Sequence, residues 1–193
     1  IIRRLLNGEK LDFEGEYYNT KGAKLYSPPL KEVPIWLAAG GPKSSHLAAE
    51  FADGLMISVK NPEDAYERVI NPAQIKTDEL GKSQLRVHTY RWTMFAQNDD
   101  DAWESLKSWR GLRAPNRLQE IDPQALREQA DALPKEEIMS KFSRAGTIDE
   151  LVDIYSPLVD DFGSEIVTIQ ISSVDQEETI KLLGKELLPR LKK

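Results

Sequence analysis

Residues 33–60, with the sequence VPIWLAAGGPKSSHLAAEFADGLMISVK, decide the fold of this chain. The apolar run at 33–39 predicts a strand buried on both faces of a sheet. A Gly-Gly-Pro turn at 40–42 ends this strand and leads into a helix. A second apolar run at 55–58 predicts the next strand. Together these elements form one βαβ unit, and because a crossover helix joins its two strands, the strands must be parallel.

Two glycines between the end of a strand and the start of a helix also make a candidate binding site. We expect Ser44 and Ser45 to cap the helix, which runs to Phe51. The backbone of Gly40 and Gly41 can approach a ligand closely, and free N–H groups beside a helix N-terminus favour an anion. A plain βα turn, in which glycine is common for steric reasons alone, is the alternative interpretation.

The composition excludes several classes of function. The chain has 193 residues, which suits one domain, and it has no cysteine, so disulfides, thiolate metal sites and cysteine nucleophiles are excluded. This fits a cytoplasmic protein. A net charge of -6 without a basic stripe argues against nucleic acid, and no apolar run is long enough to span a membrane. His46 and His88 are too isolated for a metal site and are interpreted as structural.

The rest of the chain alternates helical and strand patterns. The start, IIRRLLNG, resembles the last turns of an amphipathic helix, and residues 11–26 predict a short antiparallel excursion. Pro72 is expected to interrupt the helix that follows the second strand. The further strands are predicted at 85–96 and 166–171, and the further helices at 61–82, 99–112, 147–162 and from 175 onwards.

Four parallel strands that alternate with helices fit two architectures, a doubly wound sheet and half of an eight-stranded βα barrel. A start within a helix favours the half-barrel. An insertion at about 113–145 departs from the alternation, because two short helical pieces at 123–133 and 135–142 have no strand between them. Barrel enzymes often build substrate contacts on segments of this kind.

Five motifs resemble the bacterial-luciferase-like superfamily, and within it the family of coenzyme F420-dependent glucose-6-phosphate dehydrogenases. They are GEYY at 15–18, VPIWLAAGGP at 33–42, ADGL at 52–55, IDPQALREQADALP at 121–134 and ELLPRLKK at 186–193. The first two are shared widely in the superfamily, whereas ADALP is more particular to the sugar-phosphate branch. The resemblance implies an α/β fold of the (βα)8 TIM-barrel class, of which residues 1–193 form the C-terminal half, about four βα units with a helical insertion.

The resemblance also implies roles for individual residues. Ala38, Ala39, Gly40 and Gly41 match the turn whose backbone holds the phosphate side of the deazaflavin coenzyme F420, with FMN as the alternative cofactor. No residue matches the catalytic histidine, tryptophan and acidic residue of these enzymes. We therefore expect the catalytic residues in a preceding N-terminal half-barrel, without which this chain is expected to be inactive.

Three cations fall at or near positions where these enzymes bind the phosphate of the substrate. They are Lys60, Arg117 and Lys141. Arg117 matches a family lysine and Lys141 a family arginine, so the two residue types are exchanged. The exchange keeps the preference for an anion, although an arginine fork and a lysine point charge are not equivalent.

The expected function is an F420-dependent dehydrogenase that acts on a CH–OH group. It would transfer a hydride between a sugar phosphate similar to glucose 6-phosphate and coenzyme F420, in the cytoplasm and as a homodimer when intact. Two alternatives stay open. One is a luciferase-like oxidoreductase or monooxygenase that uses F420 or FMN on an unphosphorylated substrate, and the other is a non-catalytic cofactor-binding module.

Overall fold

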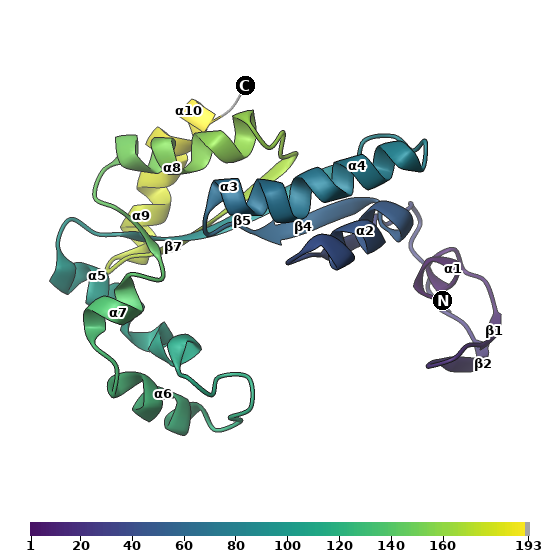
Figure 1. Cartoon of the computed structure of the whole chain (residues 1–193), viewed down its shortest axis with the longest axis horizontal. Helices are drawn as coiled ribbons and strands as arrows, with labels where there is room; N and C mark the ends of the chain where they lie inside the picture. Colours follow the sequence, from purple (N-terminus) through teal and green to yellow (C-terminus); the bar gives the residue numbers. More distant parts are fainter. Residues whose placement is uncertain (192–193) are drawn as a thin grey trace.

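A single parallel sheet organises the chain, for which a computed structural model describes residues 1–191 (Figure 1). Lys192 and Lys193, the end of the tail that carries part of the resemblance, lie outside the described residues. The strands of the sheet are β3 (Trp36–Ala38), β4 (Gly54–Ser58), β5 (Arg86–Phe95), β6 (Ser143–Ala145) and β7 (Ile166–Ser172). Every pairing among them is parallel, as the sequence predicts.

Strand β5 is the centre of the sheet. Its residues 86–90 pair with β4, and its residues 88–94 pair with β7. Beyond the end of β4, residues 93–95 pair with β6. Since β7 already occupies one side of Thr93 and Met94, β6 must lie on the same side of β5 as β4. One strand therefore fixes the positions of three others.

The structure corrects the strand predictions at two points. The first strand is shorter and more exposed than predicted, because Val33 is exposed and Pro34 has no N–H to donate. In the described residues β3 pairs only with β4, so it lies at an edge. Strand β6 was not predicted at all. Its three residues, SRA, show no alternation, and it is held partly by Arg91, whose Nε and Nη2 donate to Ser143 Oγ over 2.9 and 2.7 Å.

The helices follow the prediction closely, and the N-terminal pair of strands is antiparallel as expected. That pair is β1 (Leu11–Glu14) with β2 (Asn19–Ala23). The α-helices are α1 (Ile2–Leu6), α2 (Pro42–Phe51), α3 (Pro62–Ala65), α4 (Asn71–Glu79), α5 (Asp99–Leu106), α6 (Pro123–Asp131), α7 (Lys135–Met139), α8 (Ile148–Asp160), α9 (Gln176–Leu182) and α10 (Leu188–Leu191). The 3-10 helix is η2 (Lys107–Arg113), and the π-helices are η1 (Tyr66–Ile70) and η3 (Leu183–Leu187).

The expected break at Pro72 does not occur. Helices α3, η1 and α4 continue one another from residue 62 to residue 79. The π-helix η1 ends just before Asn71-Pro72, and its wider turn relieves the contact between the proline ring and the preceding turn. The chain therefore accommodates the proline by changing the helix type rather than by ending the helix.

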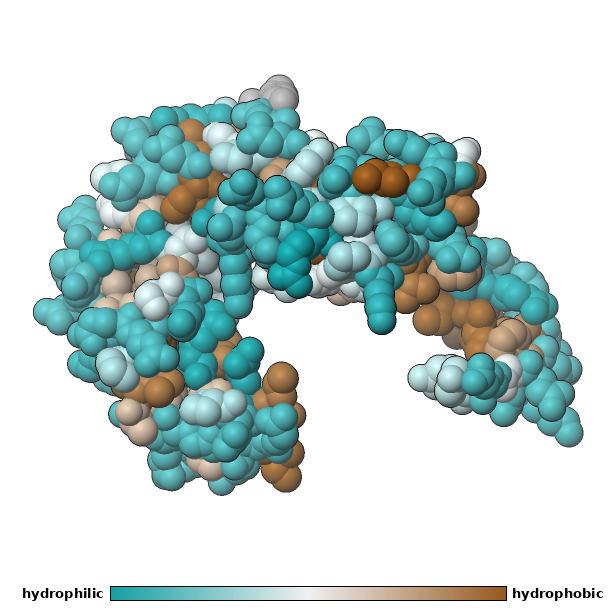
Figure 2. All heavy atoms as spheres, viewed as in Figure 1, coloured by the Kyte–Doolittle hydropathy of each residue, from teal (hydrophilic) through white to brown (hydrophobic). Residues whose placement is uncertain are grey.

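The two faces of the sheet differ because side chains alternate along each strand. Val87, Thr89 and Thr93 of β5 are buried, and the main hydrophobic core lies on their side, between the sheet and helices α2, α4 and α8. His88 and Tyr90 stay partly exposed on the opposite face. Figure 2 shows that the molecule is hollowed, between the insertion at one end and the β1–β2 pair at the other.

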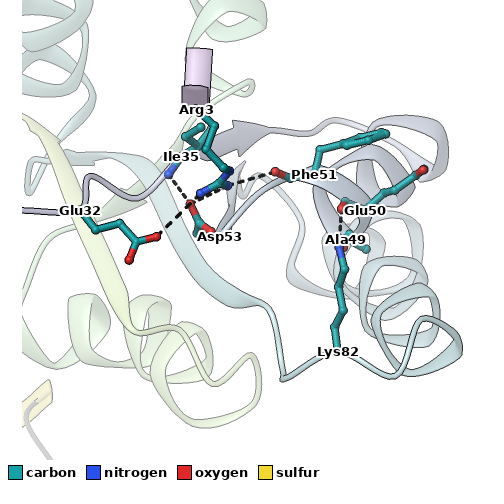
Figure 3. Close-up of polar contacts among 8 residues, drawn as sticks. All are labelled: Arg3, Glu32, Ile35, Ala49, Glu50, Phe51, Asp53 and Lys82. Carbon is teal, nitrogen blue, oxygen red and sulfur yellow. Dashed lines mark hydrogen bonds and ion pairs between the residues drawn. The ribbon is translucent and has the colours of Figure 1, made fainter. Parts of the chain in front are cut away.

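A polar network ties the N-terminal segment to the amino-terminal ends of β3 and β4 (Figure 3). The Asp53 carboxylate accepts hydrogen bonds from Ile35 N–H over 2.7 Å and from Arg3 Nη2 over 2.9 Å. The Ile35 bond, assisted by Arg3, lowers the pKa of Asp53. Lys82 donates to the carbonyls of Ala49 and Glu50 at the end of α2. In barrel folds this end of the strands contributes stability, whereas sites lie at the opposite end.

Tyr155 attaches α8 to the central strand. Its ring is fully buried, and its hydroxyl donates to the Arg91 carbonyl over 2.9 Å and lies 3.0 Å from Thr93 Oγ1. Burial raises the pKa of Tyr155 to about 12. The phenol is therefore held neutral in the folded chain at pH values where a free tyrosine would ionise.

We expect Tyr155→Phe to lower the free energy of unfolding by about 1–3 kcal/mol, because the Arg91 carbonyl and the Thr93 hydroxyl lose their buried partner. Urea unfolding at neutral pH measures this. Because the folded pKa lies above the unfolded one, the contribution of this group is complete below pH 10 and is lost as the pH rises through 12. The variant should lack that alkaline loss. Tyr66→Phe is the control, and equal effects of the two changes would contradict the prediction.

Candidate functional site

Three adjoining pockets lie at the carboxyl ends of the strands. One has a volume of about 340 Å³, one of about 480 Å³ and one of about 220 Å³. We call them the glycine-turn pocket, the central pocket and the cation pocket. Lys60, two residues beyond β4, lines all three. In a parallel sheet the carboxyl ends meet at one rim, which is where βα-barrel sites form.

The glycine-turn pocket holds three of the four predicted cofactor residues. Ala38, Ala39 and Gly40 form one wall, and Gly41 follows at the N-cap of α2. The Ala39 N–H is used inside the sheet, where it donates to the Met56 carbonyl over 3.0 Å. This wall therefore continues directly from the end of β3 and stays hydrogen-bonded to β4 as far as Ala39.

The two glycines leave open space in front of the turn. A Cβ placed on Gly40 or Gly41 would meet no atom within 4 Å. The backbone conformation does not demand glycine, because Gly41 has an extended φ of -177° that any residue adopts. The space that the missing side chains leave is consistent with the close approach of a ligand.

The hydrogen bonding of this turn differs from the prediction in two respects. Helix α2 begins at Pro42, whose fixed φ starts it early, and Ser44 and Ser45 lie inside its first turn instead of capping it. Both hydroxyls donate to the Gly41 carbonyl over 2.9 Å. The Gly40 N–H is not free either, because Ser44 Oγ accepts from it over 3.2 Å. Within residues 1–191, only the Gly41 N–H of this pair has no partner.

The central pocket has aromatic walls that the sequence analysis did not single out. Tyr90 and Trp92 from the open face of β5 and Phe142 before β6 line it, beside Lys60 and Lys141. The Trp92 ring packs edge-on against Phe142 at 5.0 Å and against Trp109 at 5.5 Å. Trp92 Nε1 donates to Ser172 Oγ over 2.6 Å, which fixes the ring. The alternation along β5 is the signal that identifies Tyr90 and Trp92.

The cation pocket brings the three predicted substrate residues together. Lys60, Arg117 and Lys141 all line it, although they are far apart in the sequence. None of the three makes an ion pair with any other residue of 1–191. One carboxylate, that of Glu137, lies in the same wall. The pocket therefore carries a net positive charge that the described part of the chain does not neutralise.

A fourth cation, Arg113, lines both the central pocket and the cation pocket and was not predicted. Burial and the neighbouring charge of Arg117 both lower the pKa of Arg113, and burial has the larger effect. The guanidinium of an arginine stays charged in proteins at neutral pH, so Arg113 still contributes a positive charge to the site. Arg113 lies at the end of η2, four residues before Arg117. This spacing alone does not distinguish it from the other arginines of the sequence as a candidate site residue.

The predicted insertion supplies one side of the site, and an ion pair holds it in place. Arg110 of η2 binds Asp131 at the end of α6 through two hydrogen bonds, Nε to Oδ1 over 2.5 Å and Nη2 to Oδ2 over 2.9 Å. The Arg110 bond lowers the pKa of Asp131. Arg117 lies on the irregular segment between η2 and α6, so this pair closes the loop that carries it.

The two histidines were interpreted from the sequence as structural residues. Residues 1–191 contain no group of three potential metal-ligating side chains. His88 Nε2 lies 2.8 Å from Thr168 Oγ1 on β7, and its ring packs edge-on against Trp36 at 5.8 Å.

Among residues 1–191, no helix is long and apolar enough to cross a membrane.

Comparison with known proteins gives a match in one family and a set of similar structures. The family model described as luciferase-like monooxygenase matches residues 1–160. An F420-dependent glucose-6-phosphate dehydrogenase from Mycolicibacterium gilvum is 31% identical over 100% of this chain and 59% of its own length. The chain therefore spans little more than half the length of the curated relatives that it matches.

The similar solved structures agree on the fold. A structure of an F420-dependent secondary alcohol dehydrogenase with an F420-acetone adduct has a TM-score of 0.82 and 24% identity, over 100% of this chain and 59% of that one. The F420-dependent tetrahydromethanopterin reductase of Methanopyrus kandleri has a TM-score of 0.71 and 22% identity, over 99% and 61%. The fold class expected from the sequence, part of a luciferase-like (βα)8 barrel, is confirmed.

We expect Asp131→Asn to loosen the insertion, because it removes the charge that Arg110 binds. Amide hydrogen exchange should become faster in residues 107–131 and stay unchanged in β5. Asp149→Asn is the matched control, since Asp149 pairs with Arg190 on helix α10, outside the insertion. Faster exchange in the insertion of the control, or none in Asp131→Asn, would show that this ion pair does not hold the segment.

Proposed function

Because the chain belongs to the luciferase-like monooxygenase family, we propose that it is part of an F420-dependent dehydrogenase that acts on a sugar phosphate. The observation that carries this proposal is the meeting of Lys60, Arg117 and Lys141 in one pocket. Converging cations are the usual way to bind a phosphate dianion, since each makes a charge-assisted hydrogen bond. The relatives named as glucose-6-phosphate dehydrogenases support the same substrate class.

Coenzyme F420 is the proposed cofactor, with FMN as the alternative, and the residues present fit such a group. The open space at Gly40 and Gly41 and the single unpaired N–H of Gly41 suit a phosphate that approaches the start of α2. Ala38 and Ala39 offer small side chains beside it. When bound, the deazaflavin supplies the hydride acceptor.

The chain's own contribution to the reaction is placement. Lys60 lines the glycine-turn pocket and the cation pocket, so cofactor and substrate would occupy adjoining spaces. Cations that hold the phosphate of a sugar fix the far end of the molecule and orient its anomeric carbon in the central pocket. The base that takes the hydroxyl proton is proposed to lie in a preceding half-barrel, because no residue here matches the family's catalytic histidine.

An unphosphorylated substrate is the second candidate, and the lining of the central pocket favours it. Tyr90, Trp92 and Phe142 give that pocket an aromatic wall of the kind that binds apolar molecules. Arg117 and Lys141 also stand where the family has a lysine and an arginine, respectively. The two candidates predict different effects when the cations are removed.

We expect Arg117→Ala and Lys141→Ala to raise the KM for glucose 6-phosphate at least about tenfold, since each removes a charge-assisted contact worth about 1.5–3 kcal/mol. Affinity for F420 should stay nearly unchanged. Steady-state kinetics of the intact enzyme with glucose 6-phosphate and with free glucose measure this. Arg127→Ala, on the exposed side of α6, is the control. A loss that falls equally on both sugars would show that the cations do not bind phosphate.

We expect Gly41→Val to weaken F420 binding at least about tenfold, or about 1.4 kcal/mol, because its side chain would occupy the space left for the cofactor. The chain itself should fold normally, since the added Cβ meets no protein atom within 4 Å. Fluorescence titration with F420 measures the affinity. Gly184→Val in η3 is the control, because it is equally open and lies outside the three pockets. Unchanged F420 affinity in folded Gly41→Val would rule out this turn as the cofactor site.

A further inference from the structure

Arg113 stands out among the polar side chains of the chain. Its Nε is the one buried side-chain nitrogen or oxygen in residues 1–191 that has no hydrogen-bond partner. A buried N–H without a partner is costly, so its presence in a folded protein calls for an explanation. Arg113 also lines both the central pocket and the cation pocket.

Stacking fixes the position of the Arg113 side chain. The guanidinium carbon lies 4.3 Å from the centre of the Phe142 ring, and Phe142 packs in turn against Trp92. A guanidinium that lies on an aromatic ring keeps its N–H edges free for a ligand. This aromatic support holds the fork beside the two pockets while no carboxylate neutralises it, because Arg113 has no ion pair within the described chain.

The charges around Arg113 make its position unfavourable unless an anion is present. Arg117 lies close enough to lower the pKa of Arg113, and Lys60 and Lys141 line the same pocket. Glu137 is the one carboxylate in that wall, and it forms no ion pair with these cations. Four cations around one carboxylate leave a surplus of positive charge that favours the binding of a dianion.

We propose that Arg113 is a fourth ligand of the substrate phosphate, donating to it from the side of the central pocket. This rests on the proposed function, and it deepens that function by assigning the specificity for a phosphate monoester to a residue outside the three predicted cations. With Arg113 and Arg117, two planar forks can each bind two phosphate oxygens, while Lys60 and Lys141 add point charges. A neutral sugar would leave the surplus positive charge of this pocket uncompensated and is therefore disfavoured.

The test is calorimetric titration of the chain with glucose 6-phosphate and, separately, with inorganic phosphate. Arg113→Met keeps the apolar stem of the side chain but removes the guanidinium, with its charge and the buried N–H. It should weaken binding of both probes at least about tenfold, while the Tm stays the same or rises because the unpaired N–H is gone. Arg113→Lys should recover only part of the affinity. Arg127→Met, an exposed arginine on α6 without an ion pair, should behave as the unmodified chain.

Two results would overturn this inference. One is unchanged affinity for both probes in Arg113→Met, and the other is a Tm lower by several degrees with the affinity retained, which would assign Arg113 to packing. The failure of the proposed function looks different. If the unmodified chain binds neither glucose 6-phosphate nor inorganic phosphate, the cation pocket is not a phosphate site at all. If it binds phosphate but not F420, the cofactor proposal fails and the role of Arg113 stands.

Discussion

The pairing of strand β5 with three other strands is the constraint on which the rest of the structure depends. Its lower half pairs with β4, its middle with β7 and its last residues with β6. Parallel pairing brings the carboxyl ends of these strands to one rim. The alternation of side chains along β5 then puts an aliphatic core on one face and leaves His88 and Tyr90 on the other.

The site follows from that arrangement together with two local interactions. The glycine turn is held next to the sheet because β3 pairs with β4 up to Ala38. The wall of the cation pocket is held in place because Arg110 and Asp131 tie η2 to α6. Lys60 stands between the two pockets. The amino-terminal ends of the strands carry a different kind of chemistry, in which Arg3, Asp53 and Lys82 satisfy backbone groups and add stability (Figure 3).

Most of the fold could be predicted from the sequence, because the long elements have strong periodic patterns. Three strands and the helices between them begin and end within a few residues of the predicted limits. These strands were predicted at 55–58, 85–96 and 166–171. Strand β6 was missed because three residues are too few to show a period. The predicted helix break at Pro72 was wrong because the π-helix η1 accommodates the proline. The prediction that Lys60, Arg117 and Lys141 belong to one site came from the family resemblance and not from any local pattern. Arg113 could not be predicted, because its significance depends on burial and on Phe142, which no local pattern reveals.

We propose that two anion-binding pockets share one rim and that Lys60 joins them. A crystal structure of the chain with glucose 6-phosphate and F420 bound tests it most directly. We expect the phosphate of the sugar among Lys60, Arg117 and Lys141, the sugar ring against Trp92, and a cofactor phosphate at Gly41. A sugar phosphate found outside the cation pocket, or a cofactor bound away from the glycine turn, would contradict it.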